Sequence, residues 1–209
     1  MTASEKISSH ISILLNPFFL SPLLFILLAS QMSVTAFETA LVVSMAILFY
    51  TVLPLFILYG FKRRKLIISY DVPVRSNRNK PFVLGLCSYA LGLAVFVLLP
   101  FQSAWIYAAI SAAMLVNGGL SALINLIWKI SMHANGIASF SAGLLFLTAA
   151  GFLDPLPGYP VVLSVLLFLV TAAVTGARII LKAHTPGQAV GGAFFGWLLT
   201  TGQLWLYLQ

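Results

Sequence analysis

Seven mostly apolar stretches alternate with short polar ones along the chain. Each has roughly the length of a membrane-spanning helix, which needs about 20 mostly apolar residues. The stretches are residues 11–30, 37–60, 82–99, 104–127, 136–152, 160–177 and 189–208. This pattern predicts an all-α fold, a polytopic helical membrane protein with about six to seven transmembrane helices in one bundle. We expect residues 1–209 to form a single integral membrane domain.

Prolines and glycines modify three of these stretches. Asn16-Pro17 and Ser21-Pro22 lie in the first stretch and predict a kinked, tilted or partly re-entrant helix, because proline removes a backbone donor. Pro54 predicts a bend in the second stretch. In the last stretch, two G-x-x-x-G spacings that allow helices to pack closely are formed by Gly187, Gly191, Gly192 and Gly196.

Composition supports the membrane assignment and restricts the partners. The chain is 61% hydrophobic and 7% charged, with a mean hydropathy of +1.05, whereas soluble domains carry about 25% charged residues. The chain has a net charge of +7, and its basic residues lie beside the apolar spans. We therefore expect the lipid bilayer and phosphorylated lipids as partners, not nucleic acid. Cys87 is the only cysteine, which excludes an intrachain disulfide and a cysteine-built metal site.

Three polar stretches separate the apolar spans, at residues 62–81, 129–136 and 177–188. Two spans lie between each successive pair, so all three are predicted to lie on one membrane face with the N-terminus. All eleven Lys and Arg residues fall on that face, while the opposite loops hold only Glu38 and Asp154. By the positive-inside rule this face is predicted to be cytoplasmic, in the cell membrane.

The order and spacing of residues in these stretches resemble three known motifs. The third stretch has Arg178, five residues, His184, three residues and Gln188, and the second has Ile130-Ser131-Met132-His133. A looser match lies at residues 71–81. This set is similar to the type 2 phosphatidic acid phosphatase superfamily, whose motifs are K-x6-R-P, P-S-G-H and S-R-x5-H-x3-D. The resemblance implies a membrane lipid phosphatase.

The resemblance also implies catalytic roles. His184 would attack phosphorus to form a phosphohistidine, and His133 would protonate the leaving alkoxide and then activate water. Arg178, with Arg78 and Arg75, would bind the phosphoryl oxygens, which planar guanidinium groups suit well. Solvated or headgroup-contacting roles for Arg75 and Arg78 stay open.

Further substrate contacts are implied at the same face. Ser131 and the backbone N–H groups after it would donate to phosphoryl oxygens at a helix start. Lys129 and Lys182 are candidates for added positive charge. The scheme requires no metal and no other cofactor.

Several positions depart from the family pattern. Gln188 replaces the aspartate that supports the nucleophilic histidine, and it also fits a capping box with Thr185. Ala177 replaces a serine, Met132 replaces a glycine, and Asp71 stands where a lysine is expected. These differences bear on rate and substrate more than on fold.

Three functions are compatible with these observations. The leading hypothesis is a phosphatase acting on a lipid phosphate or isoprenyl diphosphate. The second is a catalytically weakened or inactive protein that binds phosphorylated lipids. A small transporter is the third, and the lack of an intramembrane acidic residue and of any repeat argues against it.

Overall fold

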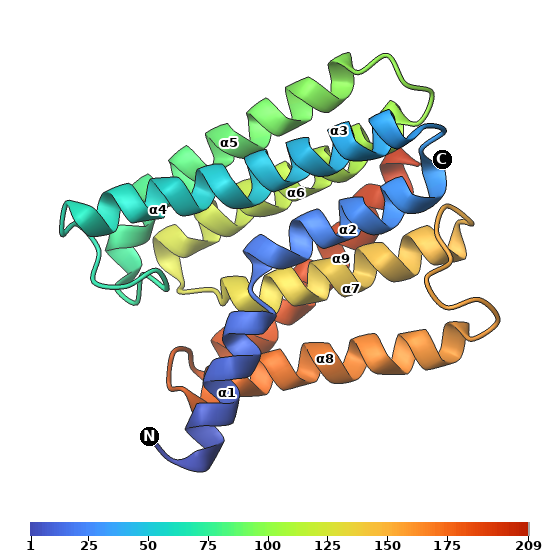
Figure 1. The fold of residues 1–209 in the computed structure, drawn as a ribbon. Helices are drawn as coiled ribbons and strands as arrows, with labels where there is room; N and C mark the ends of the chain where they lie inside the picture. Colours follow the sequence, from blue (N-terminus) through green and yellow to red (C-terminus); the bar gives the residue numbers. More distant parts are fainter. Residues whose placement is uncertain (209) are drawn as a thin grey trace.

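The computed structural model describes residues 1–208, and every regular element in that range is helical (Figure 1). A short π-helical turn (η1) and a 3₁₀ turn (η2) accompany nine α-helices among these residues. The elements are α1 (Ala3–Leu14), α2 (Pro17–Met32), α3 (Ala36–Ile47), η1 (Leu48–Val52), α4 (Leu53–Arg63), η2 (Arg75–Arg78), α5 (Asn79–Leu98), α6 (Ala104–Ile127), α7 (Met132–Ala149), α8 (Pro160–Ile180) and α9 (Pro186–Tyr207).

Four helical segments are long and apolar enough to cross a membrane. They are Ala36–Arg63, Arg75–Leu98, Ala104–Ile127 and Pro160–Ile180. A fifth is reached if α1 and α2, which meet at an angle of 46°, count as one broken span. The predicted six to seven spans are therefore too many. The surplus comes from α7 and α9, which form helices near the expected places and are long enough but not apolar enough.

The contact between α7 and α9 explains their polar composition. Helix α7 packs against α2, α8 and α9, and α9 packs on α7 with one face while its other face is exposed (Figure 1). A helix face that touches another helix can carry glycine and amide side chains that lipid would not tolerate. A Cβ on Gly192 would lie 2.7 Å from the carbonyl oxygen of Ser131, and one on Gly196 would collide with the carbonyl of Asn135. The predicted close packing is confirmed at Gly191, Gly192 and Gly196, whereas a Cβ on Gly187 would meet no atom within 4 Å.

The first stretch is broken at Pro17, as predicted, whereas Pro22 lies inside the continuous helix α2. Asn16 caps α2 by accepting from the N–H of Phe18 at 3.0 Å, and Pro17 takes the first helical position. Helix α1 therefore ends before Asn16, and α2 begins in a new direction, which produces the observed bend. Ahead of Pro54, the π-turn Leu48–Val52 widens the helix. Such a turn accommodates a carbonyl that proline leaves without its N–H partner.

A stacked aromatic group holds the bundle together away from the polar stretches. The ring of Phe25 stacks on Tyr50 at 5.3 Å, on Phe96 at 5.0 Å and on Tyr107 at 6.1 Å between centroids. All four side chains are fully buried. Phe96 and Tyr107 lie next to the α5–α6 loop, so this core fixes the end of the bundle opposite the polar loops.

Candidate functional site

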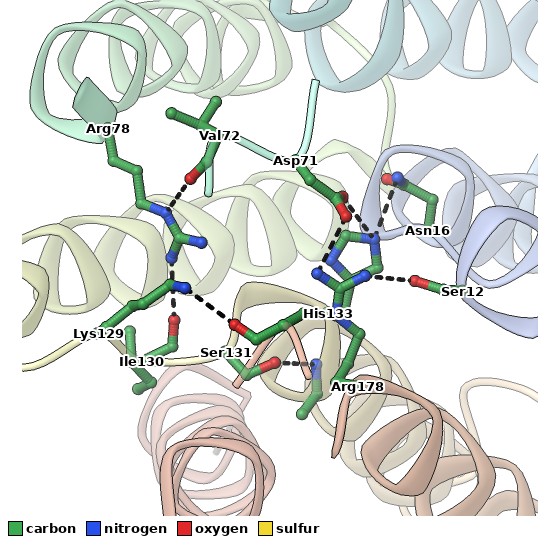
Figure 2. Close-up of polar contacts among 12 residues, drawn as sticks. Ser12, Asn16, Asp71, Val72, Arg78, Lys129, Ile130, Ser131, His133 and Arg178 are labelled. Atoms are coloured by element: carbon green, nitrogen blue, oxygen red, sulfur yellow. Dashed lines mark hydrogen bonds and ion pairs between the residues drawn. The ribbon is translucent and has the colours of Figure 1, made fainter. Parts of the chain in front are cut away.

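The three polar stretches meet at one end of the bundle, although they are far apart in sequence (Figure 2). Arg178 Nη2 forms an ion pair with Asp71 Oδ2 at 3.1 Å. Arg78 Nη1 donates to the carbonyl of Ile130 at 3.3 Å, and Lys129 Nζ donates to the carbonyl of Ala183 at 2.9 Å. Each of the three stretches therefore contacts the other two.

Arg178 lies in the last turn of α8 and is 3% exposed. Its Nη1 donates to Ser12 Oγ on α1 at 2.7 Å, while its Nη2 pairs with Asp71. Its Nε has no hydrogen-bond partner within residues 1–208. A buried guanidinium N–H without a partner is costly, so this group is well suited to a ligand acceptor.

His133 lies in the first turn of α7, which Ser131 caps by accepting from the N–H of Ala134 at 3.4 Å. Two side chains from other elements face its Nε2. Asn16 Nδ2 lies 3.3 Å away and Asp71 Oδ1 lies 3.8 Å away (Figure 2). The imidazole is therefore held between α2 and the loop before η2.

His184 lies in the short connection between α8 and α9 and is 7% exposed. Its main-chain N–H donates to the carbonyl of Arg178 at 3.3 Å, which fixes the backbone of this connection. Its Nδ1 is buried and has no partner among the described residues. Burial, together with charge repulsion from Arg78, Lys129 and Arg178, lowers the pKa of His184 to about 4. His184 is thus neutral at pH 7.

Arg78 ends the 3₁₀ turn η2 and points inward, with 4% of its surface exposed. Its Nε donates to the carbonyl of Val72 at 2.8 Å. Val72 has a φ of +43°, a region that β-branched residues rarely occupy. The loop before η2 is therefore strained at the residue that receives Arg78.

Charges in the cluster act on one another. Burial would raise the pKa of Asp71, but Arg178, His133 and Arg78 together hold it below its usual value. Burial lowers the pKa of His133, and Arg178 adds to this effect while Asp71 opposes it. The pKa of Lys129 is lowered by partial burial and by the two arginines. Three cations thus face a single carboxylate, so the site favours a further anion.

A cavity of about 200 Å³ joins these groups to apolar side chains. Its polar end carries five of the residues discussed above: Asp71, Arg78, His133, Arg178 and His184. The remaining wall is largely apolar and comes from α2, α4, α5, α6 and the start of α7, with Phe18, Leu55, Leu58, Phe82 and Leu86 among its residues. A ligand that fits must combine an anionic head with an apolar body.

Five of the predicted site residues do not line the cavity: Arg75, Lys129, Ser131, Lys182 and Gln188. Arg75 Nη1 donates to the carbonyls of Asn125, at 3.1 Å, and Leu126, so it satisfies the end of α6. Lys182 is exposed after the last turn of α8 and does not line the cavity. Gln188 Oε1 accepts from the N–H of Thr185 at 3.2 Å, which is the predicted capping box. No hydrogen bond joins Gln188 to the His184 ring within residues 1–208.

The structure adds residues that the sequence pattern did not assign to the site. Ser12 and Asn16 contact Arg178 and His133 from the N-terminal helices. Asp71 contributes the carboxylate that pairs with Arg178, although the motif has a lysine at this position. Asn16 carried a signal as a helix cap, but no pattern in the sequence connected it to a histidine 117 residues later.

The chain matches no protein-family model, and no curated protein or solved structure matches it significantly. We therefore infer the function from the geometry of the site.

Proposed function

We propose that this protein is a membrane-embedded phosphatase that hydrolyses a lipid phosphate or isoprenyl diphosphate through a phosphohistidine intermediate. One observation carries the proposal. Arg178 Nε and His184 Nδ1 are buried without partners at the charged end of a cavity whose other walls are apolar. A phosphoryl group fits the charged end, and a hydrocarbon chain fits the remainder.

The charges favour a phosphate monoester. Arg78, Arg178 and Lys129 exceed the charge of Asp71 by two, which matches a phosphate dianion. Guanidinium groups bind phosphoryl oxygens through several donors and stabilise the charge that spreads over them in the transition state.

Nucleophilic attack falls to His184. Its lowered pKa keeps the imidazole neutral, so a ring nitrogen has a free lone pair at pH 7. The nitrogen attacks phosphorus, a P–N bond forms, and the P–O bond to the lipid breaks. His133 gives its proton to the leaving alkoxide. The pKa of His133 is low in the empty site, but a bound dianion raises the pKa of a neighbouring imidazole and supplies the protonated form.

Water completes the cycle. His133, now neutral, takes a proton from a water molecule whose oxygen attacks phosphorus. The P–N bond breaks, inorganic phosphate leaves and His184 returns to its starting form. Asn16 holds His133 from α2 through both halves of the reaction.

The membrane setting fits an amphiphilic substrate, since the charged loops lie at one end of helices long enough to span a bilayer. We propose that this end faces the cytoplasm at the cell membrane, in line with the Lys and Arg residues gathered there. A Ser76→Cys variant in a Cys87→Ser background tests the orientation in intact cells. Labelling by an impermeant thiol reagent only after permeabilisation supports the assignment, and labelling from outside reverses it.

Phosphate release from a panel of lipid phosphates and diphosphates tests the activity. The purified protein in detergent micelles should release phosphate, and His184→Ala and His133→Ala should each lower the rate at least about 10³-fold. His10→Ala is the matched control, because His10 is exposed on α1 and bonds only its own helix, at Lys6. Equal rates in all four proteins would reject the proposal.

A second function is favoured by two specific observations. Gln188 is occupied in a capping box and leaves the His184 ring without a supporting acceptor, and Asp71 already neutralises part of the charge. A protein that binds phosphorylated lipids without turning them over would have this arrangement. Saturable binding of a lipid phosphate, with no phosphate release and no labelled histidine, would establish this second function.

A further inference from the structure

A second cavity of about 110 Å³ continues from the first into the middle of the bundle. The two cavities share Pro17, Tyr89, Gly118 and Met132 in their walls. The second cavity contains none of the charged residues, and its walls come from α2, α5, α6, α7 and α9.

The cavity is elongated along the helices. Its residues on α7 run from Met132, beside the charged cluster, to Gly143, which lies eleven positions further. At 1.5 Å per helical residue this is about 16 Å. On α2 and α6 the lining residues recede from the charged end in the same direction, from Pro17 to Leu24 and from Gly118 to Ile110. A narrow space of this shape suits one extended chain.

The two amide side chains in its wall bond neighbouring side chains. Asn117 Nδ2 donates to Ser139 Oγ at 2.8 Å and to Thr200 Oγ1 at 3.3 Å, and Asn135 Nδ2 donates to Asn117 Oδ1 at 3.2 Å. Most of the remaining wall is apolar. Since an apolar cavity of about 150 Å³ holds a molecule the size of benzene, the smaller space here holds the end of one chain.

We infer that this inner cavity binds the hydrocarbon chain of a single-chain phosphorylated amphiphile whose head occupies the charged cluster. The inference rests on the proposed function for the position of the head. Gly118 lies where the two cavities meet, and Gly143 lies at the inner end. The substrate class is therefore a monoalkyl, monoacyl or prenyl phosphate. The distance from the charged cluster to Gly143 limits the length of its chain.

Gly143 provides a direct test of chain length. A Cβ there would lie 3.5 Å from Leu24 and 3.8 Å from Thr200, so a larger side chain enters the cavity without meeting backbone. Gly143→Leu fills the space that the chain end would use. Gly202→Leu is the matched control, because a Cβ on that exposed residue of α9 meets no atom within 4 Å.

Binding of n-alkyl phosphates, from butyl to hexadecyl phosphate, is measured for the purified proteins in nanodiscs. Each methylene that enters dry protein raises affinity about fourfold, so Gly143→Leu should weaken long-chain binding about tenfold or more. Butyl phosphate, which does not reach Gly143, should bind equally to all variants. An unchanged chain-length profile in Gly143→Leu, whether or not the protein releases phosphate, overturns the inference.

A photoreactive alkyl phosphate separates this inference from the proposed activity. With a diazirine at the chain end, cross-links should fall on cavity residues such as Leu24, Phe140 and Leu204. Cross-links only on lipid-facing residues, or none at all, overturn the inner cavity as the chain site. Phosphate release by the wild-type protein is scored separately, so loss of the chain site and loss of the enzymatic proposal are distinct results.

Discussion

Two polar clusters lie in this bundle, and they differ in how completely their members bond one another. The inner cluster joins α6, α7 and α9 through Asn117, Ser121, Asn135, Ser139 and Thr200. None of its buried polar atoms lacks a partner within residues 1–208. The outer cluster, at the charged end, leaves Arg178 Nε and His184 Nδ1 open.

Burying a polar group without a partner costs about 1–3 kcal/mol. Among the described residues, the inner cluster leaves no such group open, whereas the outer cluster leaves two beside an excess of positive charge. We propose that an anionic ligand satisfies these two groups. Mutations should separate the two clusters, because one set affects stability and the other affects binding and turnover.

The largest effect is expected at Arg178. Arg178→Gln removes charge and donors from the phosphoryl site and should lower kcat/KM about 10²–10³-fold, as the loss of one transition-state donor does in other enzymes. Arg75→Gln is the control, because Arg75 bonds the carbonyls at the end of α6. It should keep the activity. Comparable losses in the two variants would contradict the separation between site and helix end.

Asn135 in the inner cluster should show the opposite behaviour. Asn135→Ala leaves Asn117 Oδ1 and Ser121 short of a donor and should lower the free energy of unfolding by about 1–3 kcal/mol. Activity per folded molecule should stay within about twofold. The exposed Asn77→Ala serves as the control in thermal unfolding. A large loss of turnover in well-folded Asn135→Ala protein would contradict the structural role.

Asp71 competes with the proposed substrate for Arg178 and His133. Asp71→Asn removes that competing charge at a half-exposed position and should raise the affinity for inorganic phosphate or vanadate about five- to tenfold. Asp154→Asn, in the opposite loop, should leave the affinity unchanged. Weaker anion binding in Asp71→Asn would mean that the carboxylate positions the cations and does not compete.

The smallest expected effect is a pH dependence of stability. The pKa of His184 is about 4 in the folded protein against an ordinary value of 6.5, so the unfolded chain binds more protons between these values. The free energy of unfolding should be highest above pH 6.5 and should decline as the pH falls towards 4. Thermal unfolding of His184→Gln should depend less on pH in this window than wild type, and His10→Gln should not differ from wild type. Identical pH profiles in all three would contradict the buried neutral state of His184.

Helix positions and local signals could be predicted from the sequence because they depend on neighbouring residues. The Asn16-Pro17 break, the close glycine packing of α9 and the Thr185–Gln188 capping box all follow from short-range rules. The number of spans was overestimated, because an apolar stretch does not show whether its helix will face lipid or other helices. The contact between α7 and α9 relaxes the need for apolar residues on the two faces that meet.

The site was predicted only in part for a similar reason. Arg75 and Arg78 are three residues apart in the same polar stretch, yet one caps α6 and the other turns inward. That difference depends on where α6 ends, which the stretch itself does not encode. The contact of Asp71 with Arg178 spans 107 residues and likewise has no local signal.

In the proposed reaction, the outer cluster places a phosphoryl group on His184. The most direct test incubates the purified protein with a lipid phosphate labelled in its phosphoryl group, quenches it in alkali, which preserves phosphohistidine, and maps the label by mass spectrometry. We predict a label on His184 that is absent from His184→Ala and retained in His10→Ala. A protein that binds the lipid at saturation but carries no label on His184 would contradict the account.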